Sequence, residues 1–297
     1  MTRANQQIGT STKKVTRGIG KGTLALRQAI WDTFQETGKP VTVRQMFYLV
    51  SVRGAVEKAE SGYRKVQRQL LAMRREGWIP YGWIADNTRW MRKPKTWGSL
   101  TELFEYWAPR FRATLWRDID AYVEVWCEKD ALAGVLYDVT AAYDVPLMVA
   151  RGYSSESYAH DAAEAIQEQG KPAFIYYVGD FDPSGWHMSR NLEAKLRGFG
   201  ADIHFTRLGV MPWQVKAWNL PERETKGKDT RCKAFFAEFG KGRKSVELDA
   251  IPPDLLRQMV REAIESHIPE GALKAVEAEE EGARSALNQI AECWRES

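Results

Sequence analysis

The 297-residue sequence contains few cysteines and no long apolar run. Its three cysteines, Cys127, Cys232 and Cys293, are odd in number and far apart, which disfavours a disulfide framework and a CxxC zinc site. No apolar run approaches the roughly 20 residues of a membrane span, and the first residues lack the apolar core of a secretory signal. We therefore expect a cytoplasmic location, in the nucleoid or, for a viral protein, in the host cytoplasm, and no membrane partner.

Charge is divided unevenly along the chain. Residues 1–117 hold 22 Lys and Arg against 8 Asp and Glu, whereas residues 118–297 hold 21 against 31. A basic half of this kind favours a polyanion as partner, with DNA or RNA ahead of an anionic membrane surface. The acidic half suits metal binding, although a solvated surface would account for most of its carboxylates.

The basic half begins with residues 1–21, which are polar, basic and rich in glycine and therefore predict a flexible arm. Three helices are expected after it, over about 23–37, 43–53 and 62–76. An aromatic and β-branched segment, WIPYGWIADNTRW, follows and predicts a strand or small wing. This order is typical of a winged-helix DNA-binding domain, which we assign to residues 22–118.

The third expected helix has two distinct faces. Its apolar face collects Tyr63, Val66, Leu70 and Met73. Another face collects three arginines, Arg64, Arg68 and Arg75. Charged stripes are often only solvated, but in a strongly basic half this one is expected to contact DNA phosphates.

From about residue 120 the expected elements alternate between strand and helix. The strands are AYVEVWCE, VPLMVARG, PAFIYYVGD and ADIHFTRLG, with a helix between each pair. Such a series predicts an α/β fold in which helices cover a mostly parallel, Rossmann-like sheet. We assign residues 119–297 to this domain, with further helices at its C-terminal end.

The third of these strands ends in two aspartates, Asp180 and Asp182, followed by Pro183 and Gly185. In extended geometry both carboxylates face the same side, and two like charges so close favour a divalent cation between them. Asp, Pro and Gly are also ordinary turn formers, so the motif alone leaves both interpretations open. Ligands of parallel sheets bind at the carboxyl ends of strands, and Glu128 ends the first strand. Three carboxylates are therefore expected to converge there.

These residues carry a resemblance to a known family. VEVWCEKDAL, followed about fifty residues later by GDFDPSGWH, resembles the Toprim domain, whose signature is a Glu after one strand and DxD after another. The EKDA and DPxG flanks are similar to the A subunit of topoisomerase VI and its meiotic double-strand-break relatives. ARGYSS resembles that family's GKGYPD segment, and VRQMFYLV resembles the segment that carries its catalytic tyrosine. LPERETKGKDTRCKAFF and VELDAI are weaker likenesses, and in size the chain is similar to the A-like proteins of mobile elements.

The resemblance implies a DNA-cleaving transesterase like the A subunit of a type IIB topoisomerase, an isomerase. It implies that Glu128, Asp180 and Asp182 bind Mg²⁺, or Mn²⁺ in its place, and that Tyr48 is the nucleophile with Arg44 beside it. The implied partners are double-stranded DNA and a second copy of the chain. No ATPase is recognisable in the sequence, so ATP-driven strand passage would need a separate B-type ATPase subunit.

Helical periodicity gives Tyr48 independent support. Val43, Met46, Phe47 and Val50 form the apolar stripe of the second helix. Tyr48 lies roughly 150° away from that stripe, on the side of Arg44, and is expected to be exposed. Its attack on a DNA phosphate would leave a 5′-phosphotyrosyl bond and a 3′-hydroxyl. An exposed tyrosine whose hydroxyl only caps a neighbouring group is the alternative.

The two residues that follow Glu128 are expected to have other roles. Lys129 is expected to contact phosphate, and Asp130 to cap the following helix. Two other functions stay open. One is a Toprim nuclease that hydrolyses DNA with metal-activated water, and the other is a non-catalytic DNA-binding protein whose carboxylates are structural. A primase is disfavoured because the chain has no CxxC pair.

Overall fold

In the computed structural model, residues 19–85, 94–150, 154–225 and 230–295 are described. The chain divides into two compact units, Met1–Ile84 and Ala85–Ser297, which are treated separately. The expected flexible arm lies outside the described residues except at its end, where a helix already begins at Lys21. Residues 85–118, which we assigned to the first domain, belong to the second unit.

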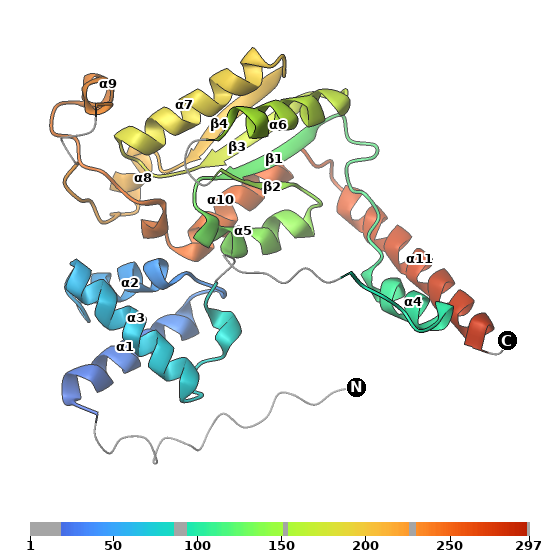
Figure 1. The fold of residues 1–297 in the computed structure, drawn as a ribbon, viewed down its shortest axis with the longest axis horizontal. Helices are drawn as coiled ribbons and strands as arrows, with labels where there is room; N and C mark the ends of the chain where they lie inside the picture. Colours follow the sequence, from blue (N-terminus) through green and yellow to red (C-terminus); the bar gives the residue numbers. More distant parts are fainter. Residues whose placement is uncertain (1–18, 86–93, 151–153, 226–229, 296–297) are drawn as a thin grey trace. The chain divides into compact units, whose positions relative to one another are not determined.

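Within its described residues, the first unit is built from three α-helices (Figure 1). They are α1 (Lys21–Glu36), α2 (Val43–Val52) and α3 (Glu60–Arg75). All three expected helices are confirmed to within two residues at each end. Helix α2 begins where the sequence predicts, because Thr42 accepts a hydrogen bond from the backbone N–H of Gln45 while Gln45 accepts one from that of Thr42.

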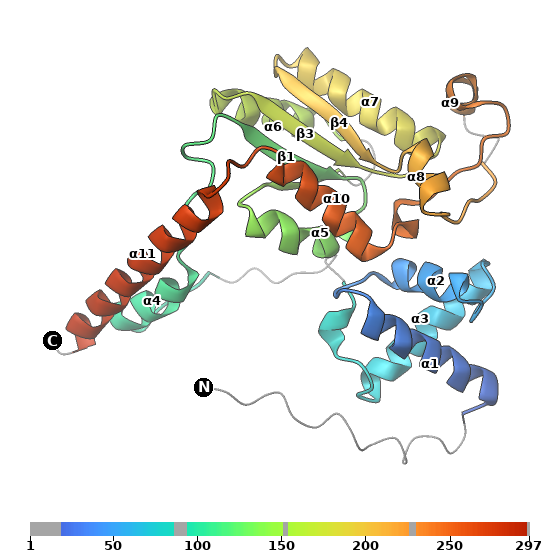
Figure 2. The ribbon, with the colours of Figure 1, turned by 180° about the vertical axis from the view of Figure 1, so that it is seen from behind.

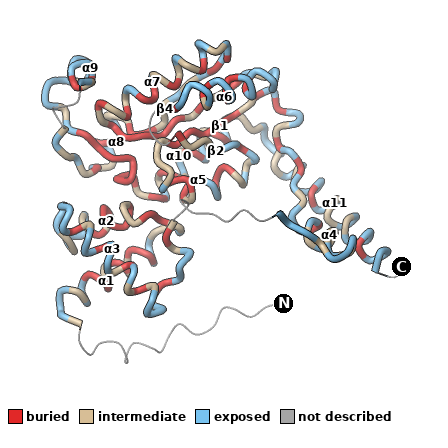
Figure 3. The backbone as a smooth tube through the Cα atoms, viewed as in Figure 1, coloured by how far each residue is buried: buried red, intermediate tan, exposed pale blue. Residues whose placement is uncertain are grey.

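Packing in the first unit follows the apolar faces of these helices. Val66, Leu70 and Met73 of α3 are buried as expected, and Tyr63 is half-buried. Figure 3 shows these buried stretches in all three helices.

The expected wing is not confirmed. The segment that follows α3 forms a short 3₁₀ turn, Tyr81–Trp83, and then a single bridge between Ile84 and Val41. Pro80 and Gly82 favour such a turn over a regular strand. Residues 86–93, the second half of the expected wing, lie outside the described part of the chain.

A four-stranded parallel sheet forms the centre of the second unit, which confirms the α/β class. The strands are β1 (Tyr122–Cys127), β2 (Leu147–Val149), β3 (Ala173–Val178) and β4 (Ile203–Gly209). Their order is β2-β1-β3-β4, so β1 and β3 are neighbours at the middle of the sheet. Cys127 pairs with Val178 at their ends, and the residues that follow both strands therefore emerge at one edge.

Helices cover both faces of the sheet (Figures 1 and 2). On one face lie α6 (Glu156–Glu168) and α7 (Pro183–Gly198), and on the other lie α5 (Asp130–Ala142) and α10 (Pro253–Glu265). Trp126, Ile175 and Tyr177 of the sheet pack in one core with Leu192 and Leu196 of α7. Strand residues of both parities are buried because the sheet is covered twice.

The described residues of this unit form four further α-helices. They are α4 (Leu100–Trp107), α8 (Pro212–Ala217), α9 (Cys232–Phe239) and α11 (Ala272–Arg295). Helices α4 and α11 lie side by side in both views (Figures 1 and 2). The buried Glu280 of α11 accepts hydrogen bonds from Arg112 at 2.9 Å and from Arg284 at 2.6 Å. None of the helices in the described ranges has the length and apolar character to cross a membrane.

Candidate metal centre at the carboxyl edge of the sheet

Glu128 and Asp180 meet where the two central strands end. Glu128 follows β1, and its backbone N–H donates to the Val178 carbonyl at 3.0 Å. Its Oε2 in turn accepts the backbone N–H of Asp180 at 2.9 Å. The structure thus brings together the first two carboxylates that the sequence predicts at this edge.

Asp182 has a structural role at the same edge. It is the N-cap of α7, where Oδ1 accepts the Gly185 N–H at 2.8 Å, and Pro183 is the first residue of the helix. A side chain at Gly185 would collide with the Asp180 carbonyl, and one at Gly179 would collide with the Glu128 carboxylate. The DxDPxG motif is therefore a helix start as well as a pair of carboxylates, and its glycines allow the close approach.

Lys129 lies among the acidic side chains of this edge. Its Nζ is 2.7 Å from Asp180 Oδ1 and 2.7 Å from Asp249 Oδ2, and it lies 4.0 Å from Glu247 Oε2. Its side chain is only 22% exposed. The ammonium that we expected to contact phosphate is engaged with carboxylates in this structure. Asp130 is not at the N-cap position we expected, because Lys129 takes that position of α5 and its side chain makes no cap hydrogen bond.

Two arginines complete the charges of the site. Arg223 forms ion pairs with Asp182, at 3.3 Å between Nη2 and Oδ2, and with Glu247. Arg207 lies beneath the aspartate turn, where it donates to the carbonyls of Gly179, at 2.8 Å, and of Asp180. Sequence reasoning assigned no role to either arginine.

Glu247 and Asp249 were also given no ligand role, yet both are buried at this edge. The Phe181 and Val246 backbones exchange hydrogen bonds of 2.9 Å in each direction, so the VELDAI segment runs beside the aspartate turn. The alternation of the two acids was a usable signal, although Asp249 lies in the 3₁₀ turn Leu248–Ala250 that follows Glu247 and not in an extended segment. Their long-range partner could not be read from the sequence.

Burial and like charge shift the titration of these groups. Burial and, after it, the charge of the neighbouring Asp180 raise the pKa of Glu128 to about 7, against the opposing effect of the Asp180 N–H. Burial likewise raises the pKa of Asp180, although Lys129 opposes the shift. Burial alone would lower the pKa of Lys129, but Asp249, Asp180 and Glu247 outweigh it and raise that pKa. Carboxylates buried this close together favour either a retained proton or an added cation.

The residues present fit a divalent cation in chemistry and in charge. Five carboxylates face three cationic side chains when all are ionised, which leaves two negative charges in excess. They are Glu128, Asp180, Asp182, Glu247 and Asp249 against Lys129, Arg207 and Arg223. Oxygen ligands of this kind suit Mg²⁺ and Mn²⁺.

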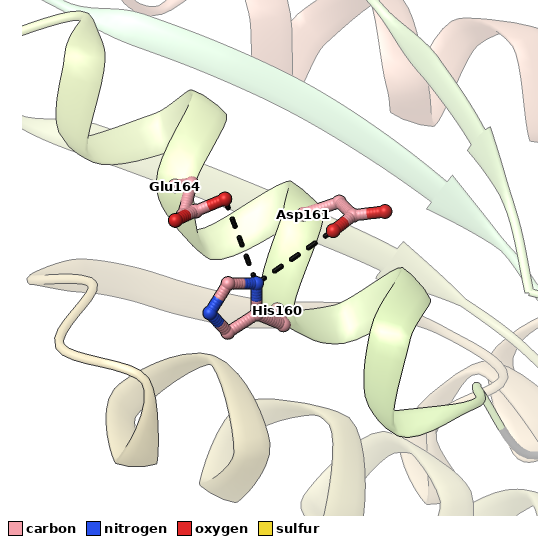
Figure 4. A group of neighbouring side chains, drawn as sticks. All are labelled: His160, Asp161 and Glu164. Atoms are coloured by element: carbon pink, nitrogen blue, oxygen red, sulfur yellow. Dashed lines mark ion pairs between the residues drawn. The ribbon is translucent and has the colours of Figure 1, made fainter.

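A different group has the tighter spacing of ligand atoms. Within the described ranges, one set of His, Cys, Asp or Glu side chains has three ligand atoms within 4.8 Å of one another: His160, Asp161 and Glu164 of α6. His160 Nδ1 lies 3.6 Å from Asp161 Oδ1 and 3.5 Å from Glu164 Oε2 (Figure 4). Glu128, Asp180 and Asp182 do not meet that spacing. All three residues of the α6 group are exposed, and surface acids commonly gather without an ion.

Tyr48 lies in the first unit, and its side chain corrects one expectation. The residue is buried, with 7% of its surface exposed, although periodicity predicted exposure. Helix α2 packs against both α1 and α3, so more of its circumference is covered than a one-sided stripe predicts. The Arg44 guanidinium lies over the Tyr63 ring at 4.8 Å, and Lys58 Nζ lies 6.0 Å from the centre of the Tyr48 ring.

Three of the arginines of α3, Arg64, Arg68 and Arg75, are exposed, as expected for a contact surface. Arg64 forms an exposed ion pair with Glu60 of the same helix at 3.3 Å. Such a surface pair is weak and would give way readily to a phosphate.

No protein-family model matches the chain, and no curated protein matches its sequence at a significant level. The likeness to the Toprim domain therefore rests on the short motifs that end β1 and β3, and the likeness to the topoisomerase VI A family rests on these and on short segments such as the one around Tyr48.

Proposed function

We propose that this chain is a Mg²⁺-dependent DNA-cleaving transesterase of the topoisomerase VI A type. The observation that carries the proposal is the acidic edge, where two neighbouring parallel strands end in Glu128 and in Asp180 and Asp182. These three side chains would hold the ion, with Mn²⁺ able to take its place. When bound, the ion would position the scissile phosphate and stabilise charge on its oxygens.

The charge distribution supports DNA as the substrate. The strongly basic first 117 residues include the exposed arginines of α3, which could pair with backbone phosphates. Double-stranded cleavage would need two nucleophiles, and one chain supplies a single candidate. A homodimer on double-stranded DNA follows from that requirement. Strand passage would further need a separate B-type ATPase subunit.

In the proposed reaction, the Tyr48 phenol attacks the DNA phosphorus. A bond forms between Tyr48 Oη and phosphorus while the bond from phosphorus to O3′ breaks. The phenol proton passes to a base, and the leaving O3′ takes up a proton to become a free 3′-hydroxyl. Arg44, half-buried on the same helix, would supply positive charge to the phenolate or the phosphate.

A second candidate function is favoured by the burial of Tyr48. A phenol that is 7% exposed must be uncovered before it can reach a phosphate. Hydrolysis by water at the same acidic edge needs no such movement. In that case the product carries a free 5′-phosphate and no protein.

The test is incubation with supercoiled DNA and Mg²⁺ or Mn²⁺, a detergent quench, and analysis with and without protease. Transesterification predicts protein attached to 5′ ends, released only by protease and lost in Tyr48→Phe. Tyr81→Phe is the matched control, because Tyr81 is an exposed tyrosine of the same unit. Cleavage that persists in Tyr48→Phe with free 5′-phosphates would establish hydrolysis. DNA binding that is equal in EDTA, without cleavage, would establish a non-catalytic binder.

A further inference from the structure

Arg223 holds the one oxygen of Asp182 that does not cap helix α7. Asp182 Oδ1 is committed to the Gly185 N–H at 2.8 Å. Its Oδ2 lies 3.3 Å from Arg223 Nη2. The Asp182 oxygen that is not engaged in capping α7, and so is best placed to bind a cation, is therefore the one that Arg223 contacts.

The backbone of Arg223 is fixed beside the aspartate turn. Arg223 and Ser245 exchange backbone hydrogen bonds of 2.9 Å in both directions. Val246 makes the same exchange with Phe181, which lies between the two aspartates. A narrow antiparallel ladder thus holds the Arg223 backbone close to the site, while its long side chain keeps rotational freedom.

The three cations of the site differ in how firmly they are held. Lys129 is 22% exposed and lies 2.7 Å from each of two carboxylates. Arg207 donates to four backbone carbonyls and to the Ser189 hydroxyl. The Arg223 side chain is 37% exposed, and the partners described for its guanidinium, Asp182 and Glu247, are both carboxylates. It is the cation best placed to exchange its partner.

We propose that Arg223 is a displaceable counter-charge: a metal ion takes its place at Asp182, and the released guanidinium then contacts a phosphate of bound DNA. The inference rests on the proposed metal site. Glu247 stays paired with one end of the Arg223 guanidinium. The guanidinium therefore moves only a short way and stays at the acidic edge. Arginine suits this exchange because its planar fork pairs equally well with carboxylate and phosphate.

The first test measures Mn²⁺ binding to the full chain without DNA. The electron spin resonance signal of free Mn²⁺ reports how much of the ion remains unbound. Arg223→Ala should bind Mn²⁺ roughly tenfold more tightly than the unmodified chain, because a competing positive charge is gone. Arg223→Lys should stay near the unmodified value. Arg190→Ala is the matched control, since Arg190 of α7 forms an exposed ion pair with Glu238 of α9. His160→Ala, added to each protein, removes the exposed α6 group as a source of signal.

The second test is binding of a short DNA duplex with and without Ca²⁺, used as a probe ion. With Ca²⁺, Arg223→Ala should weaken binding and reduce the log-log salt slope by roughly one. Without a divalent ion it should change little, because Arg223 then stays with its carboxylates. Thermal unfolding checks folding, and Arg223→Gln replaces the alanine variant if that one fails to fold.

The outcomes separate this inference from the metal site itself. Mn²⁺ binding that is lost in Asp182→Asn but unchanged or weaker in Arg223→Ala would overturn the inference and leave the metal site intact. No Mn²⁺ binding to any of the proteins would overturn both. An equal loss of DNA affinity with and without Ca²⁺ would show that Arg223 contacts DNA from a fixed position, against the proposed exchange.

Discussion

Glu124 is a buried carboxylate that the proposed chemistry does not use. It is 2% exposed, and its two oxygens accept the Tyr122 hydroxyl at 2.7 Å and the Trp126 indole N–H at 2.6 Å. Burial raises its pKa above the ordinary value of about 4.5, against the effect of both hydrogen bonds. At Glu124 the folded state therefore binds a proton more tightly than the unfolded state. The free energy of unfolding falls as pH rises from about 4.5 through the pKa of Glu124 in the folded protein.

We expect Glu124→Gln to remove this pH dependence. The glutamine oxygen can accept the Trp126 indole N–H, and its amide can donate to the Tyr122 hydroxyl, so no buried polar group loses its partner. Urea unfolding at a series of pH values above about 4.5 would compare the two proteins. A slope that is equal in both would show that Glu124 is ionised in the fold throughout.

The carboxylates of the candidate site should differ from one another in their effect on stability. Glu128→Gln removes a buried charge, and its amide oxygen can still accept the Asp180 N–H, so the free protein should be as stable or more stable. Asp180→Asn takes a partner from the poorly exposed Lys129 and should cost about 1–3 kcal/mol of the free energy of unfolding. Both should lose Mn²⁺ binding. Thermal unfolding without metal measures the first effect, and equal destabilisation by both changes would contradict it.

At this scale the sequence predicted which carboxylates lie at the edge but not what surrounds them. Strand ends and a parallel sheet suffice to place Glu128 beside Asp180. The pairing of Asp182 with Arg223 depends on a segment about forty residues later in the chain, and local pattern carries no information about it. Tyr48 shows the same limit, because the width of a buried helix face depends on how many neighbours pack against it.

Regular elements were predicted well where periodicity is local. The three N-terminal helices and the alternation of four strands with helices are confirmed within a few residues at most ends. The pairing of α4 with α11 was not predicted. The two helices are far apart in the sequence, and the hydrogen bond from Arg295 to Glu105 joins residues 190 positions apart. The wing is not confirmed: Pro80 and Gly82 turn the chain after α3, and the rest of the expected segment lies outside the described residues.

Helix α3 carries a prediction of its own. Arg64→Ala and Arg68→Ala should each lower DNA affinity and reduce the log-log salt slope by roughly one for each lost phosphate contact. Both side chains are exposed on a helix whose opposite face is packed, so folding should be unaffected. Binding of a short duplex at several salt concentrations measures the slope. Arg197→Ala, an exposed helical arginine of the second unit, serves as control, and an unchanged slope in both α3 variants would remove α3 from the interface.

At the scale of the whole molecule, the parts of the proposed reaction are divided between the basic and the acidic regions of the chain. The first unit contains the candidate nucleophile and the basic helix, and the second contains the acidic edge. Neither unit has both halves of the proposed reaction. A complete site must therefore combine Tyr48 with the carboxylates of the same chain or of a second copy.

We expect the second arrangement, in which Tyr48 of one protomer works with Glu128, Asp180 and Asp182 of its partner. Tyr48→Phe protein and Glu128→Gln protein should each be inactive alone. In a mixed dimer, one shared site is defective in both parts while the other pairs an intact tyrosine with intact carboxylates. Mixing should therefore restore nicking of one strand of supercoiled DNA, with protein attached to the nick.

The alternative gives the opposite result, because sites built within one chain are all damaged in such a mixture. Subunit exchange must be shown separately, for example by capturing untagged protein with a tagged partner. Mixed Tyr81→Phe and Glu128→Gln protein is the control, since Tyr81 is not proposed to react and the Tyr81→Phe protein should be active alone. Continued inactivity of the Tyr48→Phe and Glu128→Gln mixture after proven exchange would exclude shared sites and favour cleavage within one chain or hydrolysis without Tyr48.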